Sequence, residues 1–288
     1  MDHPSETIRL LHGRASIRQY DDRPIEPDVL EAVLEAGVRA PTGGMQPYSI
    51  ITITDTETKQ KIFDMDGCGQ KQILNAPVDL LFCLDMHRNE RWADLRDAPF
   101  TANASFEEWW ISFQDVIICA QSIVTAADAV GLGSVYIGTV YWYFEKLREL
   151  FHMPDGVFPV VLLCMGYPKG ERPAPRKKLG RSIVIHDGAY HEPSDEELLA
   201  AIDEKHGGGV EATEKRVEAV ARASRRVGGE ELEARVRAAI ERQGRLNAAQ
   251  TIYGLAYCAD KSVENNSGYL ETLEKAGFAW HKPYPLKD

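Results

Sequence analysis

Two arginines and a serine alternate near the N-terminus, in the run GRASIRQYDDRPI (residues 13–25). Alternate residues of an extended segment share a face, so Arg14, Ser16 and Arg18 would point the same way. A guanidinium carries a planar fork of donors, which suits an anion or a carbonyl-rich ring. The alternative is a pair of surface arginines bonded to Asp21 and Asp22. The spacing alone favours this alternative slightly.

A second candidate lies where an apolar helix runs into a strand, in the stretch APTGGMQPYSIITIT (residues 40–54). The connection carries Pro41, Thr42, two glycines and a Gln-Pro pair, which is more than a simple turn needs. Local turn chemistry is one explanation. The other is that the backbone lies flat against something, which glycine permits because it has no Cβ.

The run GLGSVYIGT (residues 131–139) is a strand entry studded with glycines. It lacks GxGxxG spacing, so it is not a dinucleotide-binding fingerprint. A helix C-cap and a tight turn account for Gly131 and Gly133. They leave Gly138 unexplained, and a glycine at that position would let a backbone amide approach a ligand closely.

A basic loop follows the last expected strand, in the run ERPAPRKKLGRSIV (residues 171–184). Its prolines favour an extended loop of low conformational entropy. Such a cluster could bind a phosphate, although basic loops are more often merely solvated. The basic residues are Arg172, Arg176, Lys177, Lys178 and Arg181.

Hydrophobic periodicity and capping signals place these motifs on an α+β framework. Ser105, with Glu108 three residues later, predicts a capping box that starts a long helix, and Gly131 is its expected C′ residue. Helices are expected at 6–12, 27–41, 56–65, 105–131, 144–151, 194–205 and, as a charged pair broken at two glycines, 210–243. Strands are expected at 49–54, 78–84, 134–137 and 158–165.

The chain has 288 residues, a net charge of −11 and 44% hydrophobic residues, which is ordinary for a soluble enzyme. The acidic balance argues against a nucleic-acid partner or an anionic membrane. The most apolar run, 116–130, has polar interruptions that indicate a buried helix and not a membrane span. Five separated cysteines without a CxxC pair favour neither a disulfide framework nor a metal site. Because no signal-peptide pattern opens the chain, we expect a cytoplasmic protein.

The composition changes after residue 185, from interspersed helices and strands to charged helices. We therefore expect two domains: residues 1–192 carry the site motifs, and residues 193–288 form a helical C-terminal extension. The charged pair of helices at 210–243 is interpreted as a solvated arm, because charges at i, i+4 spacing usually form an exposed face.

The motifs follow one another in a fixed order: an arginine-serine-arginine start, an Ala-Pro-Thr-Gly-Gly helix end, a Gly-Leu-Gly-Ser-Val-Tyr-Ile-Gly strand, and a Gly-Tyr-Pro segment with a basic loop. In this combination residues 8–185 resemble the nitroreductase family of FMN-dependent oxidoreductases. The resemblance implies an α+β fold with a central mixed or antiparallel sheet flanked by helices. It also implies a homodimer that holds two FMN molecules at its interface.

The resemblance assigns roles to the N-terminal motif. Arg14 and Ser16 would hold the phosphate and the ribityl chain of FMN. Arg18 would face the pyrimidine edge of the flavin, where a fixed cation stabilises the charge that reduction brings. A second phosphate clamp would come from Arg176 together with Lys177 or Lys178.

The resemblance also assigns roles to two backbone segments. A backbone amide in the segment 137–139 would bond flavin N5, and the segment 41–43 would reach across the dimer, where Thr42 would donate to a ring oxygen. The implied cofactor-binding residues are Arg14, Ala15, Ser16, Arg18, Pro41, Thr42, Gly43, Ile137, Gly138, Thr139, Arg176 and Lys178.

This chain departs from the family pattern in the loop 42–46, which is one residue shorter than usual, lacks an asparagine and offers Met45. Tyr48 stands where the family often has tryptophan. The segment CGQKQILNAPVDLLFCLDMHRNERW (residues 68–92) resembles a family branch in which this segment links the second strand to the rim of the active site.

The resemblance implies that NADH or NADPH passes hydride to flavin N5. An electron-poor aromatic acceptor, nitroaromatic or quinone-like, would then take the electrons on the same face in ping-pong fashion. This chemistry needs no acid–base side chain, and neither a catalytic residue nor a metal ligand is expected. Candidate substrate contacts are Trp109, Trp110 and Tyr141, with core packing as the alternative. Two other functions stay open: a reductive dehalogenase of the same fold, and a flavin-binding or assembly protein without turnover.

Overall fold

The computed structural model describes residues 3–287, and the chain divides into two compact units. The first unit comprises Met1–Pro175 and Leu270–Asp288, and the second comprises Arg176–Tyr269. The chain therefore returns to the first unit at its C-terminal end. The domain division at residues 192 and 193 remains a prediction from composition.

A four-stranded sheet forms the centre of the first unit, with the order β1-β2-β4-β3. The strands are β1 (Tyr48–Ile53), β2 (Val78–Asp85), β3 (Gly133–Ile137) and β4 (Val157–Gly166), and every neighbouring pair is antiparallel. All four expected strands are present to within a residue or two. The sequence left a mixed and an antiparallel sheet open, and the structure has the antiparallel one.

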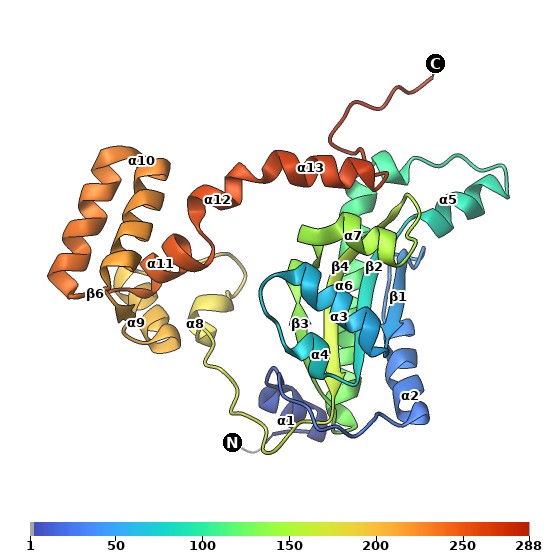
Figure 1. Cartoon of the computed structure of the whole chain (residues 1–288), viewed down its shortest axis with the longest axis horizontal. Helices are drawn as coiled ribbons and strands as arrows, with labels where there is room; N and C mark the ends of the chain where they lie inside the picture. The colour runs from blue at the N-terminus through green and yellow to red at the C-terminus, as the bar shows by residue number, and fades with distance from the viewer. Residues whose placement is uncertain (1–2, 288) are drawn as a thin grey trace. The chain divides into compact units, whose positions relative to one another are not determined.

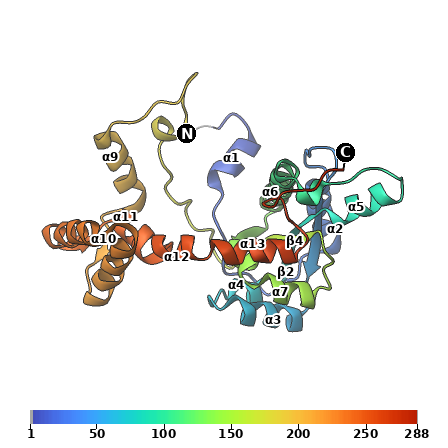
Figure 2. The same cartoon turned by 90° about the horizontal axis from the view of Figure 1, so that it is seen from above.

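Helices cover both faces of this sheet (Figures 1 and 2). The helices α2 (Pro27–Val38) and α6 (Phe106–Ala129) lie on one face, and α3 (Thr56–Asp66), α4 (Gln72–Asn75) and α7 (Phe144–Leu150) lie on the other. Every residue of β2 is buried, because its alternate side chains enter two different cores. Leu80, Phe82 and Leu84 pack towards α6, whereas Leu81 and Cys83 pack towards α3.

The long helix α6 has one buried face and one exposed apolar face. Ser105 caps it by accepting from Glu108 N at 3.2 Å, but Ser105 N donates to Ala102 O, so only half of the expected capping box forms. Gly131 follows the helix with φ +85°, as predicted. Its exposed large apolar residues are Phe106, Trp110, Ile111, Ile117 and Ile118. By length and composition α6 could cross a membrane, but core helices of soluble proteins pass the same test and α6 packs on the sheet.

Besides α4, the first unit contains other helices that were not predicted from the sequence. The expected helix α1 (Glu6–Gly13) opens the chain, and the unexpected ones are α5 (His87–Asp94), η1 (Ala102–Ala104) and η2 (Gly138–Tyr143). The helix α13 (Asn266–Lys275) leads into the C-terminal segment of this unit. Gly156 N donates to Ala276 O at 2.7 Å, and Phe278 is fully buried, so this segment completes the core.

The second unit is mostly helical. Its elements are α8 (Arg181–Val184), α9 (Asp195–His206), β5 (Val210–Glu211), α10 (Glu214–Gln243), β6 (Arg245–Leu246), α11 (Ala248–Thr251), the π-helical η3 (Ile252–Ala256) and α12 (Ala259–Glu264). The prediction that residue 210 begins a helix is wrong. Val210 and Glu211 pair with β6, and the helix starts only after Thr213.

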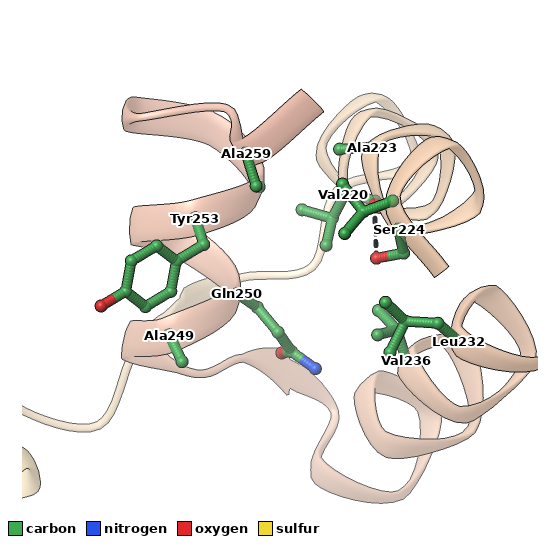
Figure 3. A pocket seen from close by; sticks show the side chains of 11 residues that line it. Val220, Ala223, Ser224, Leu232, Val236, Ala249, Gln250, Tyr253 and Ala259 are labelled. Carbon is green, nitrogen blue, oxygen red and sulfur yellow. Dashed lines mark hydrogen bonds between the residues drawn. The ribbon is translucent and has the colours of Figure 1, made fainter. Parts of the chain in front are cut away.

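The helix α10 folds back on itself at Gly228 and Gly229, which have non-helical backbone angles, as the two glycines predict. Arg237 donates to Glu218 at 2.6 Å and joins the two arms. The arms and α11 enclose an apolar cavity of about 290 Å³, into which Val220, Val236 and the Gln250 amide point (Figure 3). Its lining residues include no ionisable group except the Tyr253 phenol.

Candidate functional site

The N-terminal motif lies as an extended segment against β3. Ile17 N donates to Ser134 O at 2.9 Å, and the side chains of Ala15 and Ile17 are buried. A Cβ at Gly133 would lie 2.3 Å from Ile17 Cγ1, so this glycine is needed for the segment to dock, and not only for a turn. Because Ile17 points into the core, its neighbours Ser16 and Arg18 are on the opposite face, as the spacing predicts.

Arg14 is held beside a buried carboxylate. Its Nε atom lies 3.9 Å from Asp128 Oδ2, and Arg172 Nη1 donates to Asp128 Oδ1 at 2.8 Å. The ion pair with Asp21 or Asp22 that sequence analysis kept as an alternative is not formed by Arg14. Arg14 Nε is buried and meets no hydrogen-bond acceptor among residues 3–287, so a donor is available there. Such an orphaned buried donor fits an anionic or carbonyl-bearing ligand.

Arg18 and Ser16 line a cavity of about 300 Å³. Arg18 is exposed, and in the part of the chain that the structure describes it forms neither an ion pair nor a hydrogen bond. Lys169 and Pro168 form another wall of this cavity. The cavity therefore offers a hydroxyl and two cations to a ligand, although the Glu171 carboxylate also lines it.

The Gly-Tyr-Pro segment lies beside the arginine motif because the two pair through their backbones. Asp21 N donates to Tyr167 O at 2.8 Å, and Lys169 N donates to Gln19 O at 3.0 Å. These bonds bring the start of the basic loop to the cavity. Lys169 was not among the predicted site residues, although it directly follows the Gly-Tyr-Pro segment that supported the family resemblance.

The buried Tyr20 side chain holds the segment of Arg14, Ser16 and Arg18 against β4. Its hydroxyl lies 2.8 Å from Ile17 O and 2.9 Å from Cys164 O, the latter on β4. Burial raises the pKa of Tyr20 well above its usual range, so the hydroxyl stays protonated and keeps donating.

The segment 137–139 stands at the end of β3. Ile137 is buried, whereas Gly138 is exposed and a Cβ there would meet nothing within 4 Å. Thr139 Oγ lies 3.2 Å from Asp66 Oδ1 and 3.3 Å from Gln70 Nε2. The backbone at Gly138 is therefore open to a ligand. Sequence analysis placed the segment containing Gln70 at the rim of the site but did not select Asp66.

The loop that contains Pro41 and Thr42 lies on α6. Gly43 N donates to both carboxylate oxygens of Asp115, at 3.2 and 3.0 Å, and Gly44 N donates to Thr42 Oγ at 3.3 Å. Gly44 has φ +98°, and a Cβ at Gly43 would lie 3.0 Å from Ile111 Cγ2. Both explanations of the glycine pair thus apply, since one glycine forms a turn and the other permits a close approach.

Arg176 and Lys178 lie in the second unit and are exposed. Lys177 is 3.7 Å from Glu204, an exposed ion pair that contributes little to stability. The role of Arg176 and Lys178 as a second phosphate clamp therefore stays a prediction.

The aromatic candidates occupy different surroundings. Trp109 is half-buried between Phe113, at 5.6 Å between ring centroids, and Trp280, at 5.5 Å, as the core-packing alternative describes. Trp110 is 52% exposed. Tyr141 lines a cavity of about 510 Å³ with Asp66, Trp142 and Lys146 among its other walls. Their substrate contacts stay a prediction, and no local signal pointed to Trp280.

Residues 3–287 contain no cluster of His, Cys, Asp or Glu that could hold a metal ion. His186 and His191 are joined by a hydrogen bond of 3.2 Å from His191 N to His186 Nδ1.

Cations and a hydroxyl at one edge of an antiparallel α+β unit suit a ligand that carries a phosphate. The chain matches the nitroreductase family over residues 11–167, and it belongs to this family.

Among curated relatives, the oxygen-insensitive NADPH nitroreductase of Salmonella typhimurium is 34% identical over 202 residues, which cover 70% of this chain and 81% of the relative. The FMN reductase [NAD(P)H] of Bacillus subtilis is 35% identical over 188 residues, covering 65% and 75%. Among solved structures, the oxidoreductase YcnD of Bacillus subtilis superposes with a TM-score of 0.71 at 29% identity, covering 95% of this chain and 98% of that chain. The NADPH:FMN oxidoreductase of Vibrio harveyi complexed with NAD+ gives 0.63 at 27% identity, covering 69% and 84%.

Proposed function

We propose that this protein is an NAD(P)H-dependent FMN oxidoreductase that reduces an electron-poor aromatic acceptor, nitroaromatic or quinone-like. The observation that carries the proposal is the cavity lined by Ser16 and Arg18, next to a buried Arg14 Nε that has no acceptor within residues 3–287. FMN, when bound, supplies a two-electron hydride carrier. The relatives named oxygen-insensitive NADPH nitroreductase and FMN reductase [NAD(P)H] support this choice of cofactor and reductant.

The chain's own residues bind and orient. Arg14 and Ser16 hold the phosphate end of the cofactor, with Ala15 buried beneath them. Arg18 stands unpaired in the described part of the chain, so its charge is available to the ring edge where negative charge develops. For Arg176 and Lys178 the role of a second anion clamp rests on the family resemblance alone.

The end of β3 presents backbone to the cofactor. Ile137 is fixed in the core, and Gly138 has open space where a side chain would be, so a backbone amide of this segment can lie close to a ring. Thr139 is held from the other side by Asp66. These residues orient the reacting edge and perform no proton transfer.

The functional form is a homodimer. The exposed apolar strip of α6 contains Ile111, which also borders the loop at Gly43. Burying this strip against a second copy would place Pro41, Thr42 and Gly43 at the dimer interface. From there the loop can contribute to the site of the partner.

The reduction follows a ping-pong order, since the nicotinamide and the acceptor use the same open face in turn. No acid–base side chain is required, and none of the residues placed at the site is assigned such a role. Tyr141, which lines a separate cavity, and the exposed Trp110 are the candidates for stacking on an aromatic acceptor.

The visible spectrum of the purified protein, before and after anaerobic addition of NADH or NADPH, tests this function. A yellow protein that bleaches on addition is expected. A yellow protein that does not bleach would favour the flavin-binding alternative without turnover. A colourless protein that cannot be reconstituted with FMN would refute the proposal.

A further inference from the structure

A buried carboxylate closes the turn behind the end of β3. Asp66, the last residue of α3, is 5% exposed. It accepts from Cys68 N at 3.1 Å, from Gln70 Nε2 at 3.0 Å and from Thr139 Oγ at 3.2 Å. The last of these bonds spans 73 residues of sequence. Asp66 therefore ties the α3–α4 turn to the residue that follows Gly138.

The donor hydrogens of the Thr139 and Gln70 side chains all form hydrogen bonds within this network. The Thr139 hydroxyl has one proton, which it donates to Asp66. Gln70 Nε2 has two, which reach Asp66 at 3.0 Å and Thr139 Oγ at 3.3 Å, and Gln70 Oε1 accepts from Gln72 Nε2 at 3.1 Å. The Thr139 side chain is thus unavailable as a donor to a ligand. Its function is to fix the backbone of its own turn.

Two glycines allow the network to form. Gly67 and Gly69 both have left-handed backbone angles, with φ +62° and +68°. They turn the chain back at the end of α3, so that Cys68 N and the Gln70 side chain meet the same carboxylate. The acceptor is shared by three donors, which is an arrangement suited to an ionised group.

The charge of Asp66 is not neutralised by a cation in the described part of the chain, where Asp66 forms no ion pair. Burial, and after it the charge of Asp66, raise the pKa of the Tyr143 phenol. The same two causes raise the pKa of the exposed Cys68 thiol. The negative charge of Asp66 therefore acts on Cys68 in the α3–α4 turn and on Tyr143 at the end of η2, the helix that follows β3.

We propose that Asp66 is a positioning residue that holds the Gly138–Thr139 turn in place and whose charge lowers the reduction potential of the flavin bound there. The inference rests on the proposed function, since it needs the flavin at the end of β3. A carboxylate near a group that gains negative charge on reduction disfavours the reduced form. A neutral side chain of the same shape would remove this effect.

The test compares the wild type with Asp66→Asn and with Asp64→Asn as a matched control. Asp64 lies on the same helix but is exposed, and it accepts only from Gln60 in the described structure. The midpoint potential of the bound flavin is measured against a reference dye, and the FMN Kd by fluorescence quenching. We expect Asp66→Asn to raise the affinity for reduced FMN relative to oxidised FMN roughly tenfold, which is a rise of about 30 mV for a two-electron couple. Asp64→Asn should leave the potential unchanged.

An unchanged potential in Asp66→Asn overturns the inference, even if that variant is less stable, because a merely structural carboxylate would lower stability without moving the potential. An equal shift in Asp64→Asn overturns it as well. If Asp66→Asn does not fold, Thr139→Val provides the test. This variant keeps the charge and removes the hydroxyl that Asp66 holds, so the FMN Kd should rise several-fold, and a wild-type Kd would contradict the positioning role.

The two proposals fail in different ways. A wild type that binds no FMN refutes both. A wild type that binds FMN and bleaches with NAD(P)H, alongside an Asp66→Asn variant of identical potential, refutes the role of Asp66 alone.

Discussion

At the scale of single residues, the site depends on polar groups whose partners are missing or remote. Arg18 is an exposed cation without an ion pair in the described residues, whereas the nearby Arg23 is bonded to Glu26. A free cation beside a cavity is available to a ligand, and a cation with its own carboxylate is much less so. The difference separates two arginines that look equivalent in sequence.

Replacing Arg18 by alanine tests this assignment. Loss of one preorganised charge that stabilises a developing anion lowers a rate by roughly a hundredfold or more. We expect Arg18→Ala to slow flavin reduction by NAD(P)H to this extent, measured by anaerobic stopped-flow absorbance. Arg23→Ala is the control and should reduce at the wild-type rate; equal rates in Arg18→Ala and the wild type would refute the role of Arg18.

A second residue-scale prediction concerns a buried pair beneath the arginine segment. Burial raises the pKa of Asp79 to about 7, although Lys59 Nζ lies only 3.9 Å from Asp79 Oδ2. Burial lowers the pKa of Lys59. Both groups are thus shifted towards their neutral forms, because the attraction between them does not offset desolvation.

The sign of the pH dependence follows from the raised pKa of Asp79. Its contribution to stability is fully present below its unfolded pKa, near 4, and is lost as the pH rises through about 7. The shift corresponds to about 4 kcal/mol in the free energy of unfolding. Urea unfolding of Asp79→Asn should show a flatter pH dependence between these values than the wild type. Parallel curves for the two proteins would contradict the raised pKa, and Asp64→Asn should follow the wild type.

At the scale of elements, strands and helices are joined by few side chains across long sequence separations. Asp115 on α6 accepts from Gly43 N in the loop before β1, and Ile17 docks on Gly133 of β3. In both cases an element that is predictable by itself carries the residue that fixes a loop. The loops acquire their conformation from these contacts and not from their own sequence.

Asp115→Asn tests how strongly α6 holds its loop. Hydrogen bonds to a charged acceptor contribute about 1.5–3 kcal/mol and neutral ones about 1 kcal/mol, so the amide of Gly43 should exchange with solvent roughly tenfold faster in this variant. Hydrogen–deuterium exchange measures this directly. Gln114→Ala, an exposed neighbour on the same helix, should keep the wild-type exchange rate. Unaltered exchange at Gly43 in Asp115→Asn would show that the loop is held by something else.

At the scale of the whole molecule, the exposed face of α6 is the feature that the fold of one chain does not explain. Five large apolar side chains on one helix remain exposed. Exposed contiguous apolar surface of this kind marks an interface more often than it marks free surface. A second copy of the chain is the partner that the proposed function requires.

Ile117→Glu should therefore prevent dimerisation. A twofold interface would contain the substitution twice, so the loss of apolar burial and the cost of a desolvated charge both count double. We expect the dimer Kd to rise at least a hundredfold, measured by sedimentation at several concentrations, and FMN to be retained poorly. Leu95→Glu, at an exposed leucine outside α6, is the control. A wild type that sediments as a monomer, or an Ile117→Glu dimer of unchanged stability, would refute this interface.

The sequence by itself determined the four strands of the sheet, the two longest helices and the order of the motifs. The apolar runs of β2 and α6, the Ser105 cap and the glycine pair in α10 act over a few residues, so local pattern predicts them. The alternation of Arg14, Ser16 and Arg18 also follows from local geometry alone, because an extended backbone has a period of two. The same reasoning failed at Val210, where a short strand pairs with a segment 35 residues later.

Only the tertiary structure decided which polar groups meet. Asp66 bonds Thr139 across 73 residues, Asp115 bonds Gly43 across 72, and Trp280 returns from the far end of the chain to pack against Trp109. The local sequence around each residue does not show which partner it contacts. An aspartate in a helix or a glycine in a loop has the same local pattern whether or not it has a distant partner. Such pairs form because a buried polar group must find a partner, and the packing of the sheet between two helical layers determines which partner lies within reach.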